Sequence, residues 1–505
     1  MASSEATERR GKRSIKRAII ATVVIVLVGG LAGGWFYLQT VATNELTQAM
    51  AEADRLDPGW RLSEVMARRA VIPEGKNSAV QVKRVFSELP VKFVDPKVVM
   101  KDNQGRTILR GAALLDSLDL VKHPSRQIDP EQTKGLRAEL ADVAQAVTDA
   151  RALAEMPRGS NDLHLDRLFL NTRLDHAQNA RQVARLLKLD VTLRAQEGDI
   201  DGALDSCRAI LNVGRSLGDE PLSISQLVRM AITGVAADCV QYVLAQGEAS
   251  DAALLKVQDL LGDESAQLLA LWALRGERAA LFDLFAKLES GEVSLSELSD
   301  GDSSSASRGV NLVGKALFRY NQGLSLKFMN EAVEIVKQPD REQQPLLAVW
   351  DVETRPPPGR IQRLAGSVTY SMIPAVAAVA RAQAQIRARL RCAEALVAVE
   401  RYRKANGRWP ETLDQLVPRY LAKLPADPFE DGPVRYTKSD DEEGVVVYSV
   451  GQDGTDNHGI LDTKFRGITG MDIGYRLWNV DRRHQPPPKP DGSTPQGAAD
   501  VIQGE

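Results

Sequence analysis

The chain has 505 residues, which at about 150 residues per domain leaves room for roughly two to four domains. Hydrophobic residues make up 43% and charged residues 26%, as in an ordinary globular protein, and the scarcity of aromatics beside plentiful Ala, Leu, Arg and Glu favours helix. The net charge of -3 argues against the basic surface with which nucleic-acid-binding proteins neutralise phosphates, so we expect no nucleic-acid partner.

The N-terminus has the pattern of a membrane anchor. Six Lys and Arg residues lie within residues 1–17, and residues 18–38 then carry no charge. At about 1.5 Å per residue, this uncharged helix would cross the roughly 30 Å hydrocarbon core of a bilayer. Trp35 and Tyr37 lie at its far end, where aromatic rings favour the interface. The positive-inside rule places residues 1–17 in the cytoplasm and everything after about residue 40 outside.

Two further readings of this segment remain open. Small residues at Gly30, Ala32 and Gly34 could serve a signal peptidase, which would make the segment a cleaved signal peptide rather than a permanent anchor. The glycines also form two overlapping G-x-x-x-G pairs, whose spacing lets two membrane helices approach closely. The glycines expected in a homodimer contact are Gly29, Gly30, Gly33 and Gly34.

The part outside the membrane begins with a helical domain over residues 41–337. Residues 41–64 have the spacing of an amphipathic helix that is broken by a turn at Asp57, Pro58 and Gly59. Residues 90–112 predict irregular structure or short strands. Apolar residues at helical spacing predict further helices over residues 131–156, 176–217, 222–246 and 251–290. Residues 176–217 predict a helical hairpin that turns at Gly198 and Asp199.

Three stretches have the composition of linkers or tails. Residues 290–309 are rich in Ser, Gly and Asp and predict a flexible insert. Residues 338–360 contain Pro339, Pro345 and a run of three prolines, which predicts a stiff, extended linker. Residues 485–505 are rich in Pro, Gly and polar residues and predict a disordered tail.

The C-terminal region, residues 361–484, has the most specific pattern. A long helical pattern over residues 369–410 ends at Asn406 and Gly407, since either accepts the left-handed conformation that closes a helix. A short helix at about 411–417 should follow, and then short strands at 434–437 and 445–450. This order predicts a small α+β module.

This region resembles the C-terminal half of the G-type major pseudopilin of type II secretion systems. The matching residues are Ala395, Leu396, Tyr402, Arg403, Asn406, Gly407, Pro410, Lys423, Leu424, Pro425, Asp427, Pro428, Tyr448, Ser449, Gly451, Asp453, Gly454, Asp472 and Ile473. They cover residues 385–475, about a fifth of the chain. The prepilin leader is missing, because Gly11 is followed by Lys-Arg-Ser-Ile. We therefore expect a borrowed module in a membrane-tethered protein and no filament.

Residues of the last loop could bind calcium. Asp453, Asp456 and Asn457 offer oxygen ligands within five positions, and the nearby glycines let the backbone bend around an ion. The resemblance to the G-type pseudopilin implies that Asp472 completes the ligand set. The alternative is an Asp-Gly turn whose carboxylates only cap backbone donors.

Catalytic and cofactor motifs are missing from the sequence. There is no G-x-S-x-G, no P-loop and no H-E-x-x-H. Cys207, Cys239 and Cys392 form no C-x-x-C pair, so we read them as small buried residues, with a Cys207–Cys239 disulfide as the alternative.

Together these patterns predict a mainly α-helical protein: a transmembrane helix, an extracytoplasmic helical bundle and a small C-terminal α+β, pseudopilin-like module. We expect it in the bacterial cytoplasmic membrane as a single-pass scaffold or interaction protein with envelope or secretion partners. The sequence favours an interaction protein over an enzyme. The alternative is an extracytoplasmic hydrolase, which would need two close acidic residues, or an acid–His pair, in a deep pocket.

Overall fold

A computed structural model of the chain describes residues 2–94, 100–101, 107–108, 114, 118, 124–294, 297, 312–360, 363, 366–372, 374–439, 441, 443–461 and 471–487. Most of the predicted flexible insert at 290–309, and the predicted tail beyond residue 487, lie outside these residues. The described part is mainly helical, with a small antiparallel sheet near the C-terminus.

A long N-terminal helix and a bundle make up most of the fold. The helices are α1 Ala2–Leu56, α2 Leu62–Ala67, α3 Ser78–Glu88, α4 Val91–Val94, α6 Pro130–Ala141, α7 Ala144–Arg151, α8 Asp175–Gln196, α9 Ile200–Arg215, α10 Ser223–Gln246, α11 Asp251–Ser265, α12 Leu269–Ser290, α13 Leu312–Lys337, α14 Asp340–Glu353, α16 Ser367–Met372 and α17 Pro374–Asn406. Short 3₁₀ helices lie at Glu74–Lys76, Ala152–Glu155, Phe169–Asn171, Leu413–Leu416 and Val480–Arg482.

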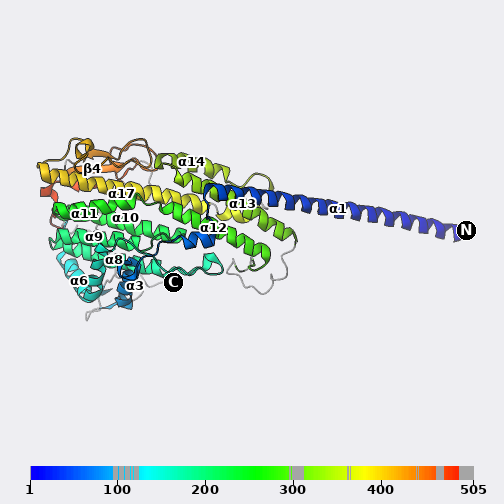
Figure 1. Ribbon diagram of the computed structural model, residues 1–505, viewed down its shortest axis with the longest axis horizontal. Coiled ribbons are helices and arrows are strands. Elements are labelled where there is room, and N and C mark those ends of the chain that lie inside the picture. Colours follow the sequence, from blue (N-terminus) through cyan, green and yellow to red (C-terminus); the bar gives the residue numbers. More distant parts are fainter. Residues whose placement is uncertain are drawn as a thin grey trace.

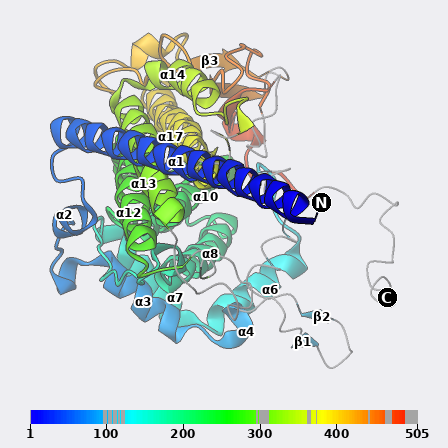
Figure 2. The same cartoon turned by 90° about the vertical axis from the view of Figure 1, so that its right-hand side faces the viewer.

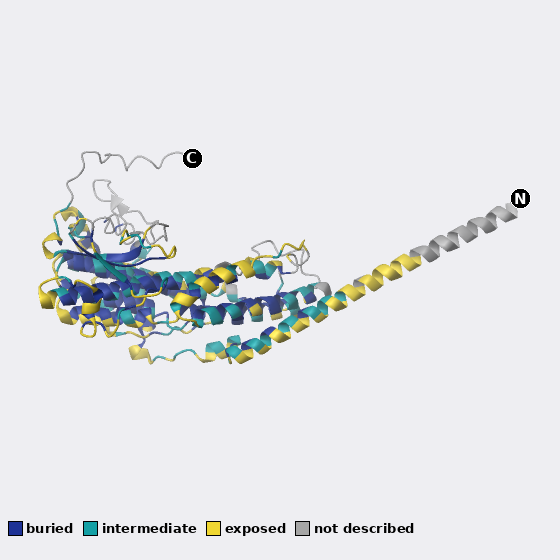
Figure 3. Cartoon of the chain, turned by 90° about the horizontal axis from the view of Figure 1, so that it is seen from above, coloured by how far each residue is buried: buried dark blue, intermediate teal, exposed yellow. Residues whose placement is uncertain are grey.

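Helix α1 projects from the body and then packs along it (Figure 1). Its side chains are exposed over most of residues 21–34, and burial begins near Trp35 and is complete at Ala42 (Figure 3). The inner part of α1 lies along α13, and the helix ends before the predicted turn, where Gly59 takes a φ of +78°. The turn at residues 57–59 is therefore confirmed.

The other helical predictions are confirmed with two refinements. Helices α8 and α9 form the expected hairpin, in which Gly198 has a φ of +81° and the Asp199 side chain accepts a hydrogen bond from the Gly202 backbone at 3.1 Å. Residues 131–156 hold α6, α7 and a 3₁₀ turn, and residues 251–290 hold two helices, α11 and α12, rather than one. Helix α10 is as apolar as a membrane span, but it lies in the interior, packed by α8, α9 and α17.

The prediction of an extended linker over residues 338–360 is wrong for most of this segment, because α14 occupies residues 340–353. Pro345 stands inside this helix and removes one backbone hydrogen bond. Leu347 and Trp350 are 1% and 2% exposed and pack against α13 and α17, so apolar burial outweighs the local cost of the proline. The composition of the segment gave no sign of this contact.

The sheet has the order β3-β4-β5 and is antiparallel throughout. Its strands are β3 Arg435–Lys438, β4 Gly444–Ser449 and β5 Ile473–Trp478, and a separate two-stranded ribbon pairs β1 Met100–Lys101 with β2 Thr107–Ile108. Strands β3 and β4 confirm the sequence prediction, whereas β5 is an addition to it. The expected short helix at 411–417 is a 3₁₀ helix, Leu413–Leu416.

Helix α17 joins the sheet to the bundle. One face of the sheet, including Val447 and Tyr475, packs on α17, while the opposite face of α17 packs on α10 and α11. A single hydrophobic cluster runs from α3 through α8–α11 to α17 and the sheet. Figure 2 looks at the end of the body from which α1 leaves and shows the sheet and α14 on one side and α3, α6 and α7 on the other. Residues 361–484 are thus part of the common core.

All three cysteines are buried free thiols. Cys207 lies on α9 and Cys239 on α10, and burial, together with the neighbouring Cys239 thiol, raises the pKa of the Cys207 thiol. Cys392 on α17 has its thiol 3.6 Å from the Ile473 carbonyl oxygen, and burial raises its pKa as well. This arrangement is that of small core residues.

Candidate functional site: the cleft between the bundle and the sheet

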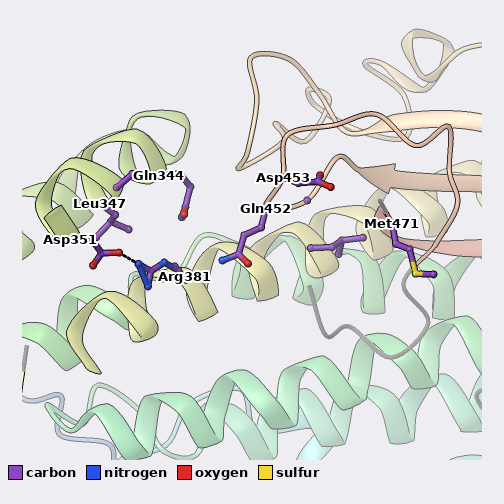
Figure 4. A pocket seen from close by; sticks show the side chains of 10 residues that line it. Gln344, Leu347, Asp351, Arg381, Gln452, Asp453 and Met471 are labelled. Carbon is purple, nitrogen blue, oxygen red and sulfur yellow. Dashed lines mark hydrogen bonds and ion pairs between the residues drawn. The ribbon is translucent and has the colours of Figure 1, made fainter. Parts of the chain in front are cut away.

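A cleft of about 520 Å³ lies where α14 and α17 meet the loop after β4 (Figure 4). This volume is within the range of about 300–1,000 Å³ that is usual for ligand pockets. The described residues that line it are Gln344, Leu347, Ala348, Asp351, Arg381, Gly451, Gln452, Asp453, Met471 and Ile473. The sequence did not indicate this cleft, because one wall is α14, and the prolines of that segment predicted an extended linker instead of a helix.

The charged groups of the cleft stand on separate walls. Asp351 on α14 forms an ion pair with Arg381 on α17, while Asp453 projects from the loop on the other side (Figure 4). The Asp453 carboxylate accepts a hydrogen bond from the Thr455 backbone at 3.1 Å. The two carboxylates therefore do not converge as a pair of catalytic acids would.

An acid–His pair exists elsewhere in the body. His176 Nε2 lies 2.9 Å from Glu220 Oε2, and Asn161 donates to the other oxygen of this fully buried carboxylate at 3.0 Å. Neither His176 nor Glu220 is among the described residues that line the cleft. The pair joins the start of α8 to the segment before α10, which favours a structural role over catalysis.

Three of the four predicted calcium ligands, Asp456, Asn457 and Asp472, lie together next to the sheet. Asp472 Oδ1 and Oδ2 accept hydrogen bonds from the Asn457 and Gly459 backbones at 3.2 and 2.8 Å, and burial raises the pKa of Asp472. Asp456 forms an ion pair with Arg435 and accepts hydrogen bonds from the Tyr448 hydroxyl and the His458 backbone at 3.1 and 2.8 Å.

These contacts fit a calcium ion only in part. Asp456, Asn457 and Asp472 meet in the loop, but calcium takes about six to eight oxygens, and the Arg435 cation stands beside Asp456. Asp453 faces the cleft and caps Thr455. Within the described residues, no group of three or more His, Cys, Asp or Glu side chains is placed to hold a metal ion. In this structure the carboxylates of Asp453, Asp456 and Asp472 accept hydrogen bonds from backbone N–H groups of the loop.

Comparison of the chain with protein-family models, with curated proteins and with solved structures found no match. The resemblance to the G-type pseudopilin thus depends only on the matching residues within 385–475.

Proposed function

We propose that this protein is a scaffold or interaction protein of the bacterial cell envelope, held in the cytoplasmic membrane by α1 with its body outside the cytoplasm. The observation that carries the proposal is the continuity of α1. The same helix holds the exposed apolar segment and, from Ala42 to Leu56, packs along α13. The body is therefore joined to the proposed anchor without a flexible linker. This suits a protein that presents a binding surface at a fixed distance from the membrane.

The C-terminal region supports a role in protein contacts. Its long helix α17 carries an antiparallel sheet, and its motifs resemble those of a pseudopilin, a subunit that works by assembling with other proteins. A secretion-associated partner is thus part of the proposal. The hydrolase alternative is less well supported, because the described carboxylates of the cleft lie apart and one is paired with Arg381.

Self-association through α1 is a further part of the proposal. Among the described residues, no atom outside the helix's own backbone lies within 4 Å of the position where a Cβ would stand on Gly29, Gly30, Gly33 or Gly34. This face is open to a second copy of the helix, at the spacing that favours close packing.

A photo-crosslinking amino acid at Gln452, on the rim of the cleft, should capture a defined envelope protein in living cells. The full chain is used, because deleting residues 385–475 would remove α17 and the sheet from the core. Glu411, exposed in the segment that follows α17, is the matched control position. A scaffold predicts a discrete adduct from Gln452 that is absent from Glu411. If neither position yields an adduct under conditions that capture known membrane complexes, the interaction role loses its support.

Calcium remains a proposed ligand of the loop at 453–459. A bound ion should raise the melting temperature of the full chain by mass action, and Asp472→Asn should abolish the rise. Calorimetry in millimolar calcium and in chelator, on the wild-type chain and on this variant, makes the comparison. An unchanged melting temperature of the wild-type chain would leave the carboxylates with their capping role alone.

A further inference from the structure

Three arginines follow α14 in a proline-rich segment, the arginine loop, in which Arg360 and Arg363 have helical backbone. Arg355, Arg360 and Arg363 are exposed, and within the described residues none of them forms an ion pair. Arg363 donates to the backbone oxygens of Pro357 and Pro358 at 3.4 and 3.0 Å. The neighbouring acid Asp351 is already paired with Arg381, so Glu353 is the exposed acid beside this cluster. The loop therefore presents an excess of positive charge.

The loop lies at the end of the body from which α1 leaves. Helices α1 and α13 run in the same direction. Arg319, near the start of α13, donates to Gln39, which directly follows the apolar segment of α1, at 3.4 Å; Lys337, at the end of α13, donates to the carbonyl of Leu56, the last residue of α1, at 3.2 Å. The start of α13 therefore adjoins the outer end of the apolar segment. Thr369, just after the arginine loop, donates to the Asn321 side chain in this early part of α13 at 2.9 Å.

Helix α14 itself points toward the same end. Asp340 at its start forms ion pairs with Arg387 and Arg391 on α17, whereas Asp351 near its end pairs with Arg381, closer to the start of α17. The start of α17 packs on the middle of α13. Figure 1 shows α14 on the flank of the body from which α1 departs.

Helix α14 also carries an apolar stripe that faces solvent. Leu346, Val349 and Val352 are 41%, 56% and 59% exposed and follow one another at three-residue spacing, so they share one face. Helices that lie in a membrane interface combine exposed aliphatic side chains with neighbouring cations in this way.

We propose that the end of α14 and the arginine loop bind anionic phospholipid headgroups in the outer leaflet of the membrane that α1 spans. The guanidinium groups pair with lipid phosphates, and Val349 and Val352 enter the interface beneath them. This contact would fix the tilt of the body on the bilayer. It rests on the proposed membrane anchor, because α1 is what brings the loop to the bilayer surface.

Hydrogen exchange of the full chain in lipid nanodiscs tests the contact. The backbone amides of residues 349–355 should exchange more slowly in discs that contain phosphatidylglycerol than in discs of phosphatidylcholine alone. One cation near an anionic surface contributes about 1 kcal/mol, which corresponds to roughly fivefold protection for each arginine that reaches it. High salt should remove the difference, because it screens exposed charges.

Two variants sharpen the test. Replacing Arg355, Arg360 and Arg363 together by Gln should abolish the lipid-dependent protection. Replacing Lys404, Arg408 and Arg419 by Gln should leave it unchanged, because these exposed cations lie in the last turn of α17 and in the segment that follows it, away from α14. Equal exchange of residues 349–355 in both kinds of disc would overturn the proposal. The amides of residues 21–34 report the anchor separately: if they exchange freely in every disc, it is the membrane anchor that fails.

Discussion

Replacing Glu264 by Gln should lower the free energy of unfolding by about 3–5 kcal/mol, because it leaves buried cations without a counter-charge. Glu264 at the end of α11 accepts two hydrogen bonds from Arg229 on α10, each at 2.7 Å, and Arg215 lies 3.6 Å from the same carboxylate. Glu264 and Arg229 are 2% and 3% exposed. Urea unfolding of the detergent-solubilised chain, followed by tryptophan fluorescence, measures the change.

The matched control for this variant is Glu411→Gln. Glu411 pairs with Arg408 at 3.0 Å, but both side chains are more than half exposed, so the loss should stay below about 1 kcal/mol. If the two substitutions cost the same, the buried network does not hold α10 and α11 together as described.

Replacing Glu394 by Gln should have the opposite effect and stabilise the protein above neutral pH. Glu394 on α17 faces α11, where Gly262 leaves room for its carboxyl group. Burial raises the pKa of Glu394 to about 7, with Arg391 opposing the shift and Asp259 and Asp263 adding to it. At high pH the native state therefore contains a buried, ionised carboxylate, which lowers the free energy of unfolding.

The sign follows from the two pKa values. Between about pH 4.5 and 7 the unfolded chain has released the Glu394 proton and the folded chain still holds it, so stability falls as the pH rises through this window. Well above pH 7 the full cost of about 3 kcal/mol is present, and Glu394→Gln should remove it. Unfolding curves at pH 5 and pH 8 should therefore differ less in the variant than in the wild-type chain. An equal pH dependence in both would show that the carboxyl group is better solvated than described.

Local sequence patterns predicted much of the fold. The positions of most helices, the hairpin at Gly198 and Asp199, the turn at Gly59 and strands β3 and β4 follow from apolar periodicity and from residues that tolerate a left-handed backbone. These signals lie within a few residues of the structure they specify, so a single sequence carries them.

Contacts between distant segments could not be predicted. The composition of residues 338–360 predicted an extended chain, whereas Leu347 and Trp350 pack α14 against α13 and α17. Because α14 was not predicted, the cleft that it forms with α17, lined by Asp351 and Arg381, was not predicted either. The pair Arg229–Glu264 likewise joins positions 35 residues apart with no motif around either. Three of the four predicted calcium ligands, Asp456, Asn457 and Asp472, lie together, but the sequence could not show that Asp456 would pair with Arg435 or that Asp472 would accept two backbone hydrogen bonds.

The orientation of the chain in the membrane is the central claim, and protease accessibility tests it most directly. The chain carries an epitope tag at its N-terminus and is expressed in bacteria, and protease is added to intact spheroplasts. We expect the body to be digested, leaving a short tagged fragment that contains residues 1–17 and the apolar segment of α1. A full-length chain that resists the protease until the membrane is lysed would contradict the proposed orientation.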